Sequence, residues 1–172
     1  MKYILFCCCF LVLSGFIHSQ EKTLTFPNNA IGIYKGNLQI SSSKGMQTIP
    51  MEFHLKATNS PNTFQYILVY NNTPRNYHLI IKDKKKGLYE IDENNGIILP
   101  ATYANNILFS LFEVQGNLLT TRLAFDKKQL DFEILFTRLK NKVKTGGTSK
   151  EIPEVFGYPI STIQRALLKK VD

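Results

Sequence analysis

The sequence contains no tryptophan and little cysteine, and its three cysteines all lie at positions 7–9. They fall inside an apolar run, residues 3–13, that follows the basic residue Lys2. A short basic start, a short apolar run and a small residue, here Ser19, are typical of a cleavable secretory signal peptide, and the run is too short to span a membrane. We therefore expect residues 1–19 to be a signal peptide and the mature chain to be secreted or periplasmic. A retained N-terminal anchor is the alternative.

Removal of that signal would leave a mature chain without cysteine, which excludes disulfides, thiolate nucleophiles and cysteine-based metal sites. Two histidines remain, His54 and His78, each on the strand face opposite its apolar neighbours, so we expect both to face solvent. The sequence also has no glycine-rich phosphate loop, nucleophile elbow or metal-ligand spacing. It therefore predicts no enzymatic activity, no cofactor and no metal site.

Acidic residues cluster at Glu90, Asp92 and Glu93, beside Asn94 and Gly96. The spacing of Asp92, Asn94 and Gly96 resembles the start of a calcium loop, but no downstream bidentate acid follows it. Glu90 and Asp92 share a strand face, as a pair of catalytic carboxylates could. A tight hairpin turn with solvated acids explains the cluster more simply, and we assign it no site.

The formal net charge of +8 is unevenly distributed along the chain. Residues 138–172 hold eight Lys or Arg against three acidic residues, whereas residues 20–137 hold twelve against ten. A basic tail of this kind favours weak contact with an anionic membrane surface or an acidic protein, although a solvated surface is the simpler explanation. We expect no nucleic-acid partner, because a secreted protein rarely meets one.

The stretch from Ile31 to Lys140 shows the pattern of an all-β domain. Turn signals such as Asn71-Asn72, Asn94-Asn95-Gly96 and Asn105-Asn106 recur at intervals of about ten to thirteen residues, a spacing typical of a β-sandwich or barrel. The clearest strand is Gln47 to Ala57, in which apolar and polar residues alternate as in a half-buried antiparallel strand. The pattern predicts nine strands, at residues 31–40, 47–57, 63–70, 75–82, 87–92, 97–103, 107–114, 118–126 and 129–140.

Nine antiparallel strands joined by hairpins must hide the edges of their sheet, and closing the sheet does this most completely. The even hairpin spacing favours a single antiparallel up-and-down β-barrel of about 8–9 strands over a two-sheet sandwich. Alternation predicts the side chains of its inward face. They are Ile49, Met51, Phe53, Phe64, Tyr66, Leu68, Tyr70, Tyr77, Leu79, Leu123, Phe125, Phe132, Ile134 and Phe136.

The composition changes after Lys140. Residues 141–150 are polar and basic and include two adjacent glycines, as flexible linkers do. Ser161 and Gln164 form a capping box, and Ile163, Ala166, Leu167 and Val171 then share one helical face. We therefore predict three parts: a signal peptide at 1–19, a β-barrel domain at 20–140, and a basic tail at 141–172 that ends in a short C-terminal helix.

Together these features resemble the calycin group of barrels, and in particular the small secreted lipocalin-like proteins of bacteria. Gly32-Ile33-Tyr34 matches the Gly-x-Trp motif of lipocalins with tyrosine in place of tryptophan, and Arg138 ends the last strand where lipocalins place a basic residue over that ring. The resemblance implies that Gly32, Tyr34 and Arg138 close one end of the barrel by a cation–π stack. The chain departs from lipocalins in lacking the long lid after the first strand, because Ser41 to Gly45 is short.

The resemblance also implies a ligand inside the barrel. Large aromatic residues leave little interior space, and tyrosines provide hydroxyl groups beside an apolar surface. We therefore predict binding of a small apolar molecule inside a secreted, lipocalin-like barrel. The residues expected to line that site are Phe64, Tyr66, Tyr70, Tyr77, Phe132 and Phe136. The alternative is a non-catalytic interaction protein whose barrel is filled by side chains and which acts through its outer face or its basic tail.

Overall fold

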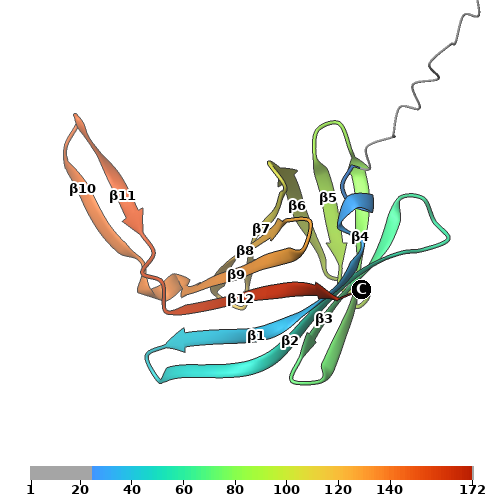
Figure 1. The fold of residues 1–172 in the computed structure, drawn as a ribbon. Coiled ribbons are helices and arrows are strands. Elements are labelled where there is room, and N and C mark those ends of the chain that lie inside the picture. The colour runs from blue at the N-terminus through green and yellow to red at the C-terminus, as the bar shows by residue number, and fades with distance from the viewer. Residues whose placement is uncertain (1–24, 172) are drawn as a thin grey trace, which may run out of the picture.

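The computed structural model describes residues 25–171, so the predicted signal peptide lies outside the described residues. Within this range the chain forms an antiparallel barrel that is closed by ten strands, and a separate two-stranded hairpin (Figure 1). The barrel strands are β1 (Gly32–Ser42), β2 (Gly45–Ala57), β3 (Thr63–Tyr70), β4 (Thr73–Asp83), β5 (Leu88–Asp92), β6 (Ile98–Ala104), β7 (Ile107–Val114), β8 (Asn117–Phe125), β9 (Gln129–Arg138) and β12 (Thr162–Val171). Two short 3₁₀ turns, η1 (Asn28–Ala30) and η2 (Leu139–Asn141), precede β1 and follow β9.

The barrel has up-and-down topology, with strand order β1-β12-β9-β8-β7-β6-β5-β4-β3-β2. Every neighbouring pair of strands is antiparallel, and tight turns join most of them. Asn71, Asn72, Asn105 and Asn106 have positive φ angles, which asparagine tolerates and two-residue hairpin turns require. The all-β, antiparallel, up-and-down barrel expected from the sequence is thus confirmed, but it has ten strands instead of eight or nine.

Strand alternation places the core inside the barrel as the sequence predicts. On β2, the side chains of Met51, Phe53 and Leu55 are buried inside, while Glu52 and His54 between them face outward and hydrogen-bond to each other. All the predicted inward residues except Phe136 belong to the hydrophobic core or pack directly against it. The apolar face of each strand therefore fixes its register, because a slip by one residue would turn the apolar side chains out to solvent.

The predicted C-terminal helix is wrong, because residues 162–171 form the strand β12. β12 pairs with β1 on one side and β9 on the other, so it closes the barrel. Ala166 and Leu168 point inward and are buried, whereas Leu167 and Lys169 are exposed. The segment is rich in residues that favour helix. Without it, however, β1 and β9 would each have an unpaired edge, and pairing with both strands outweighs the local helix propensity. The barrel domain consequently does not end at residue 140.

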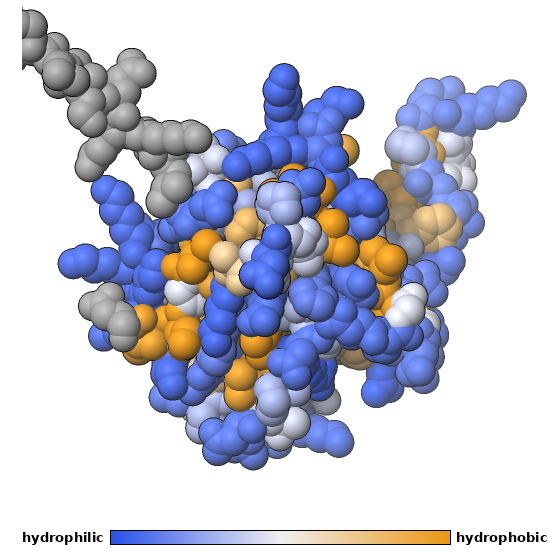
Figure 2. Space-filling model, turned by 90° about the vertical axis from the view of Figure 1, so that its right-hand side faces the viewer, coloured by the Kyte–Doolittle hydropathy of each residue, from blue (hydrophilic) through white to orange (hydrophobic). Residues whose placement is uncertain are grey.

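A hairpin that we call the arm separates β9 from β12. It consists of β10 (Val143–Ser149) and β11 (Ile152–Gly157), and every residue of both strands is exposed. The sequence predicted a flexible linker over most of β10, so this expectation is also wrong. In both views the arm stands clear of the barrel, and hydrophobic residues lie among its hydrophilic ones (Figures 1 and 2).

The two adjacent leucines of β12 provide a direct test of this strand assignment. Leu168 is fully buried and Leu167 is 55% exposed. We expect Leu168→Ala to lower the free energy of unfolding by about 2–5 kcal/mol, as core truncations do. The control Leu167→Ala should change it by no more than about 0.5 kcal/mol. Urea unfolding followed by circular dichroism measures both values, and a larger loss for Leu167→Ala would contradict the strand.

Candidate ligand-binding site

One end of the barrel is closed by the segment that precedes β1. Phe26 is 3% exposed and stacks on Tyr103, with ring centroids 3.9 Å apart, while its ring also meets Tyr89 edge-on at 5.3 Å. The hydroxyl of Tyr34 donates a hydrogen bond of 2.8 Å to the main-chain carbonyl of Ala30, which holds this segment across the barrel end. Phe26 and its aromatic neighbours thus cover this end of the barrel, beside a pocket of about 320 Å³ whose lining includes Tyr103 and Phe125.

The other end of the barrel, which we call the open end, lies opposite the segment that precedes β1. There the strands carry inward-facing apolar side chains that pack against the core but are only half-buried, in contrast to the fully buried side chains deeper in the barrel. We call this set the inner cup. Its members are Ile40, Ile49, Tyr70, Tyr77, Leu99 and Ile134. Apolar side chains that face inward and remain partly accessible are typical of the walls of a small-molecule site.

Three tyrosines on β3 and β4 bring hydroxyl groups to the base and wall of the cup. Tyr66 pairs directly with Tyr77 across the two strands, and their rings lie nearly parallel, with centroids 6.4 Å apart. Tyr70 lies further toward the open end, and the guanidinium of Arg75 sits 5.1 Å from its ring centroid. The cup therefore combines apolar walls with phenol groups from neighbouring strands.

Burial keeps these phenols neutral. Desolvation raises the pKa of Tyr70 to about 12, and Tyr77 adds to the rise, while the charge of Arg75 acts in the opposite direction. Burial also raises the pKa of Tyr66 far above its usual value, and its neighbours Tyr70 and Tyr77 add to this effect. The two side chains can thus act as neutral hydrogen-bonding groups over the physiological pH range.

The six residues predicted to bind a ligand divide into two groups in the structure. Phe64, Tyr66 and Phe132 are buried in the core, at 3%, 3% and 1% exposure. Tyr70 and Tyr77 face inward, are half-buried and belong to the cup, whereas Phe136 is half-buried on β9 and is neither in the core nor packed against it. The structure thus separates the six residues by burial, and their role in binding a ligand stays a prediction.

The cation beside the Tyr34 ring is Lys170 and not Arg138, which was predicted to stack there with Gly32 and Tyr34. The Nζ atom of Lys170 lies 5.7 Å from the centroid of the Tyr34 ring, and the absence of a side chain at Gly32 leaves room for Lys170 to reach it. Arg138 instead ends β9 at the open end, where it is exposed and pairs with Asn117 of β8. Sequence reasoning missed Lys170 because it assigned that segment to a helix.

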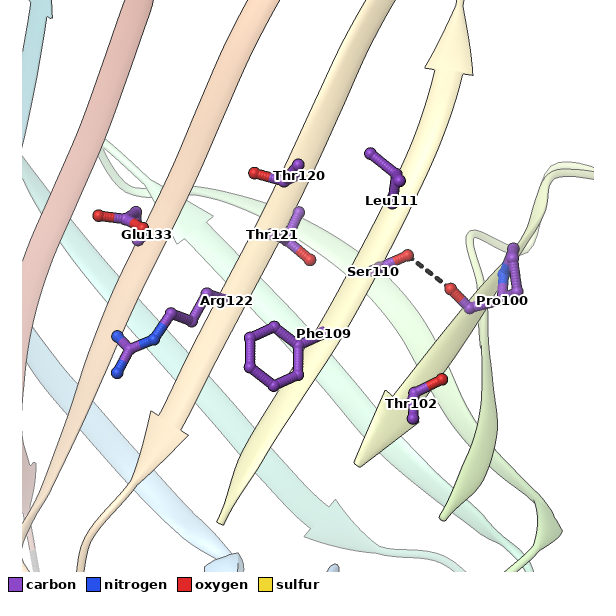
Figure 3. Close-up of a pocket in the computed structure, with 9 residues that line it drawn as sticks. All are labelled: Pro100, Thr102, Phe109, Ser110, Leu111, Thr120, Thr121, Arg122 and Glu133. Carbon is purple, nitrogen blue, oxygen red and sulfur yellow. Dashed lines mark hydrogen bonds between the residues drawn. The ribbon is translucent and has the colours of Figure 1, made fainter. Parts of the chain in front are cut away.

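A groove of about 500 Å³ lies on the outside of the barrel across β6, β7, β8 and β9 (Figure 3). Phe109 and Leu111 supply its apolar surface and Arg122 and Glu133 its charged groups. Arg122 faces outward and pairs with Asp131, its Nη1 atom 2.7 Å from a carboxylate oxygen, so it is not an inward ligand anchor. The signal that could have located this groove is Pro100, because proline inside a strand interrupts the hydrogen-bond ladder.

Comparison with known proteins identifies no family for this chain. No family model matches the chain, and a search of curated proteins finds no match to it. Among the described residues, no helix has the length and apolar character needed to cross a membrane. The same residues contain no group of three or more His, Cys, Asp or Glu side chains arranged to hold a metal ion.

Burial of Tyr70 predicts a specific loss of stability in alkali. An unfolded tyrosine has a pKa near 10, whereas that of native Tyr70 is raised to about 12. Between these values the native state binds more protons than the unfolded state, so the free energy of unfolding falls as pH rises. We expect Tyr70→Phe to remove about 2–3 kcal/mol of the fall between pH 9 and pH 12, from a shift of roughly two pKa units.

Urea unfolding at a series of pH values measures this fall in wild-type and variant protein. Tyr158→Phe, in the exposed segment after β11, is the matched control and should leave the pH dependence unchanged. Equal pH dependence in the wild type and in Tyr70→Phe would show that Tyr70 is not buried as the structure describes.

Proposed function

We propose that this protein binds a small apolar molecule with a hydrogen-bonding group in the inner cup. The observation that supports this proposal most directly is the set of half-buried, inward-facing apolar side chains that forms the inner cup, at the barrel end opposite the segment that precedes β1. A barrel whose only role was its own stability would gain from burying those side chains as well.

The depth of the cup limits the size of the ligand. Phe53, Tyr66 and Phe132 are almost fully buried and occupy the barrel below it. A ten-stranded wall encloses more space than an eight-stranded one, whose interior holds little more than side chains or one small ligand. The wider wall leaves room for a ligand, and the side chains that occupy the barrel below the cup favour a small or slender molecule over a large lipid.

The chemistry of the cup suggests what part of the ligand is recognised. Apolar walls would hold a hydrocarbon or aromatic body, and the tyrosine hydroxyl groups would donate to or accept from one polar group. In this proposal the protein acts as a secreted or periplasmic carrier of the lipocalin-like kind, delivered by the signal peptide that the N-terminal sequence predicts.

The alternative proposal is a protein that acts through its outer face or basic tail. The outer groove and the exposed arm favour it, since both present apolar side chains to solvent. The two proposals use different residues, so they can be tested separately.

Titration of the purified, delipidated mature protein with the uncharged fluorescent probe N-phenyl-1-naphthylamine tests the inner cup. We expect saturable binding, and we expect Ile134→Trp to weaken it at least tenfold, because the indole ring would fill the cup. Leu167→Trp, on the outer face of β12, is the matched control and should bind the probe as the wild type does.

Two outcomes would contradict a ligand in the cup. Binding that Ile134→Trp leaves unchanged would place the probe elsewhere on the protein. If the wild type binds nothing and Phe132→Ala newly accepts the probe, truncation has opened a cavity in a barrel that is packed solid.

A further inference from the structure

The ladder between β6 and β7 is short, and we call the place where it stops the seam. These strands pair only at Thr102–Phe109, Tyr103–Leu108 and Ala104–Ile107. Hydrogen-bonded pairs alternate with non-bonded pairs in an antiparallel ladder, and the closing pair of a two-residue turn is bonded. Counted from the turn at Asn105-Asn106, the next bonded pair after Thr102–Phe109 would join Pro100 to Leu111.

Proline cannot complete that pair, because it has no main-chain N–H. The carbonyl of Pro100 accepts a hydrogen bond of 2.6 Å from the hydroxyl of Ser110 (Figure 3). The ladder therefore stops at Pro100. By the same alternation, the main-chain groups of Leu111 and Glu113 point toward the seam, where the pairing with β6 does not extend beyond Thr102–Phe109.

The outer face of the barrel beside the seam is also apolar. Leu111 is 59% exposed and Phe109 is 41% exposed on this strand, and Ile98 is 55% exposed across the seam. An exposed strand edge with apolar side chains is a template for another strand, and natural proteins usually protect such edges with charge, proline or a covering segment. Proline protects the β6 side of the seam, whereas Glu113 is the one charged residue on the β7 side.

The arm lacks a packing partner among the strands of its own barrel. A two-stranded hairpin by itself is at best marginally stable in water. Val143, Ile152, Val155 and Phe156 of the arm are all exposed, and the only aromatic ring among them is covered by the Nζ atom of Lys142, 4.7 Å from its centroid. The arm is thus a β-structure with apolar side chains and nothing from its own barrel packed along it.

Charge makes the arm and the seam complementary. Residues 138–158, which contain the arm, hold five basic and two acidic residues, a net charge of +3. Residues 88–126, which form β5 to β8 around the seam, hold five acidic residues and one basic residue, a net charge of −4. That one basic residue, Arg122, is already paired with Asp131. Opposite net charges favour approach of the two surfaces and fix their orientation.

We propose that the arm of one copy docks on the seam of a second copy, and that the second copy's arm docks in return, to form a symmetric dimer. Strand addition to the β7 edge would satisfy main-chain groups that β6 leaves unpaired, and the apolar side chains of both surfaces would be buried together. Reciprocal exchange of the same two surfaces gives a closed twofold interface, so assembly stops at two copies.

Sedimentation velocity of the mature protein from 1 to 200 µM tests the proposal. We expect a monomer–dimer equilibrium that high salt weakens. Leu111→Lys at the seam and Val155→Lys on the arm should each raise the dimer dissociation constant at least tenfold, and replacing residues 142–158 by a short Gly-Ser linker should abolish the dimer. Leu167→Lys, equally exposed but on β12, is the matched control and should dimerise normally.

A crosslinking experiment tests the contact itself. The described residues contain no cysteine, so protein carrying Leu111→Cys can be mixed with protein carrying Val155→Cys under mild oxidation. We expect a disulfide-linked heterodimer from this mixture and much less from a mixture in which Leu167→Cys replaces Leu111→Cys.

Three results would overturn the proposal. One is a wild-type monomer at every concentration, and another is a dimer that survives loss of the arm. The third is a monomer that binds vesicles containing anionic phosphatidylglycerol through the arm, which would identify a membrane surface as the arm's occupant. Circular dichroism of each point variant establishes that it is folded, so that a lost dimer can be assigned to the interface.

Discussion

Closure of the hydrogen-bond ladder is the constraint on which this structure depends. Each barrel strand needs a neighbour on both sides, because unpaired main-chain groups along a sheet edge lose hydrogen bonds and invite aggregation. β12 meets this need for β1 and β9 together. Once the ring is closed, strand alternation determines which side chains form the core, and the arm is left as an insertion between the last two strands.

The same constraint explains which parts of the fold the sequence predicts. Strands with strong alternation, such as β2, and turns with asparagine at positive φ are specified locally, so their positions follow from sequence alone. The burial of Tyr34 also follows from alternation together with its motif. Residues 162–171 lack such a signal, because Gln, Arg, Ala, Leu and Lys are good helix formers and the inward side of β12 contributes only Ala166 and Leu168 to the core. Their strand conformation is set by β1 and β9, which lie far away in the sequence.

The candidate sites were predictable to different degrees for related reasons. Tyr70 and Tyr77 could be found because alternation places them inward, but which end of the barrel is open depends on Phe26, whose position no periodic pattern indicates. Lys170 replaces Arg138 over the Tyr34 ring because the last strand of the barrel is β12 and not β9. The seam could not be predicted from the sequence, because it is found by counting hydrogen-bonded pairs along a known strand register. That count places Pro100 opposite Leu111.

The features with functional potential all lie toward one end of the barrel. The inner cup lies there, and the arm leaves the barrel there after β9. The unpaired parts of β6 and β7, at the start of β6 and the end of β7, lie at the same end. Aromatic contacts around Phe26 stabilise the closed end. The stability of the barrel therefore depends less on the side chains at the open end. Because the proposed dimer contact lies beside the mouth of the cup, binding of a ligand and of a second copy would be thermodynamically linked wherever one alters the groups that the other contacts. The linkage acts in both directions, so a ligand that favours the dimer must also bind the dimer more tightly than the monomer.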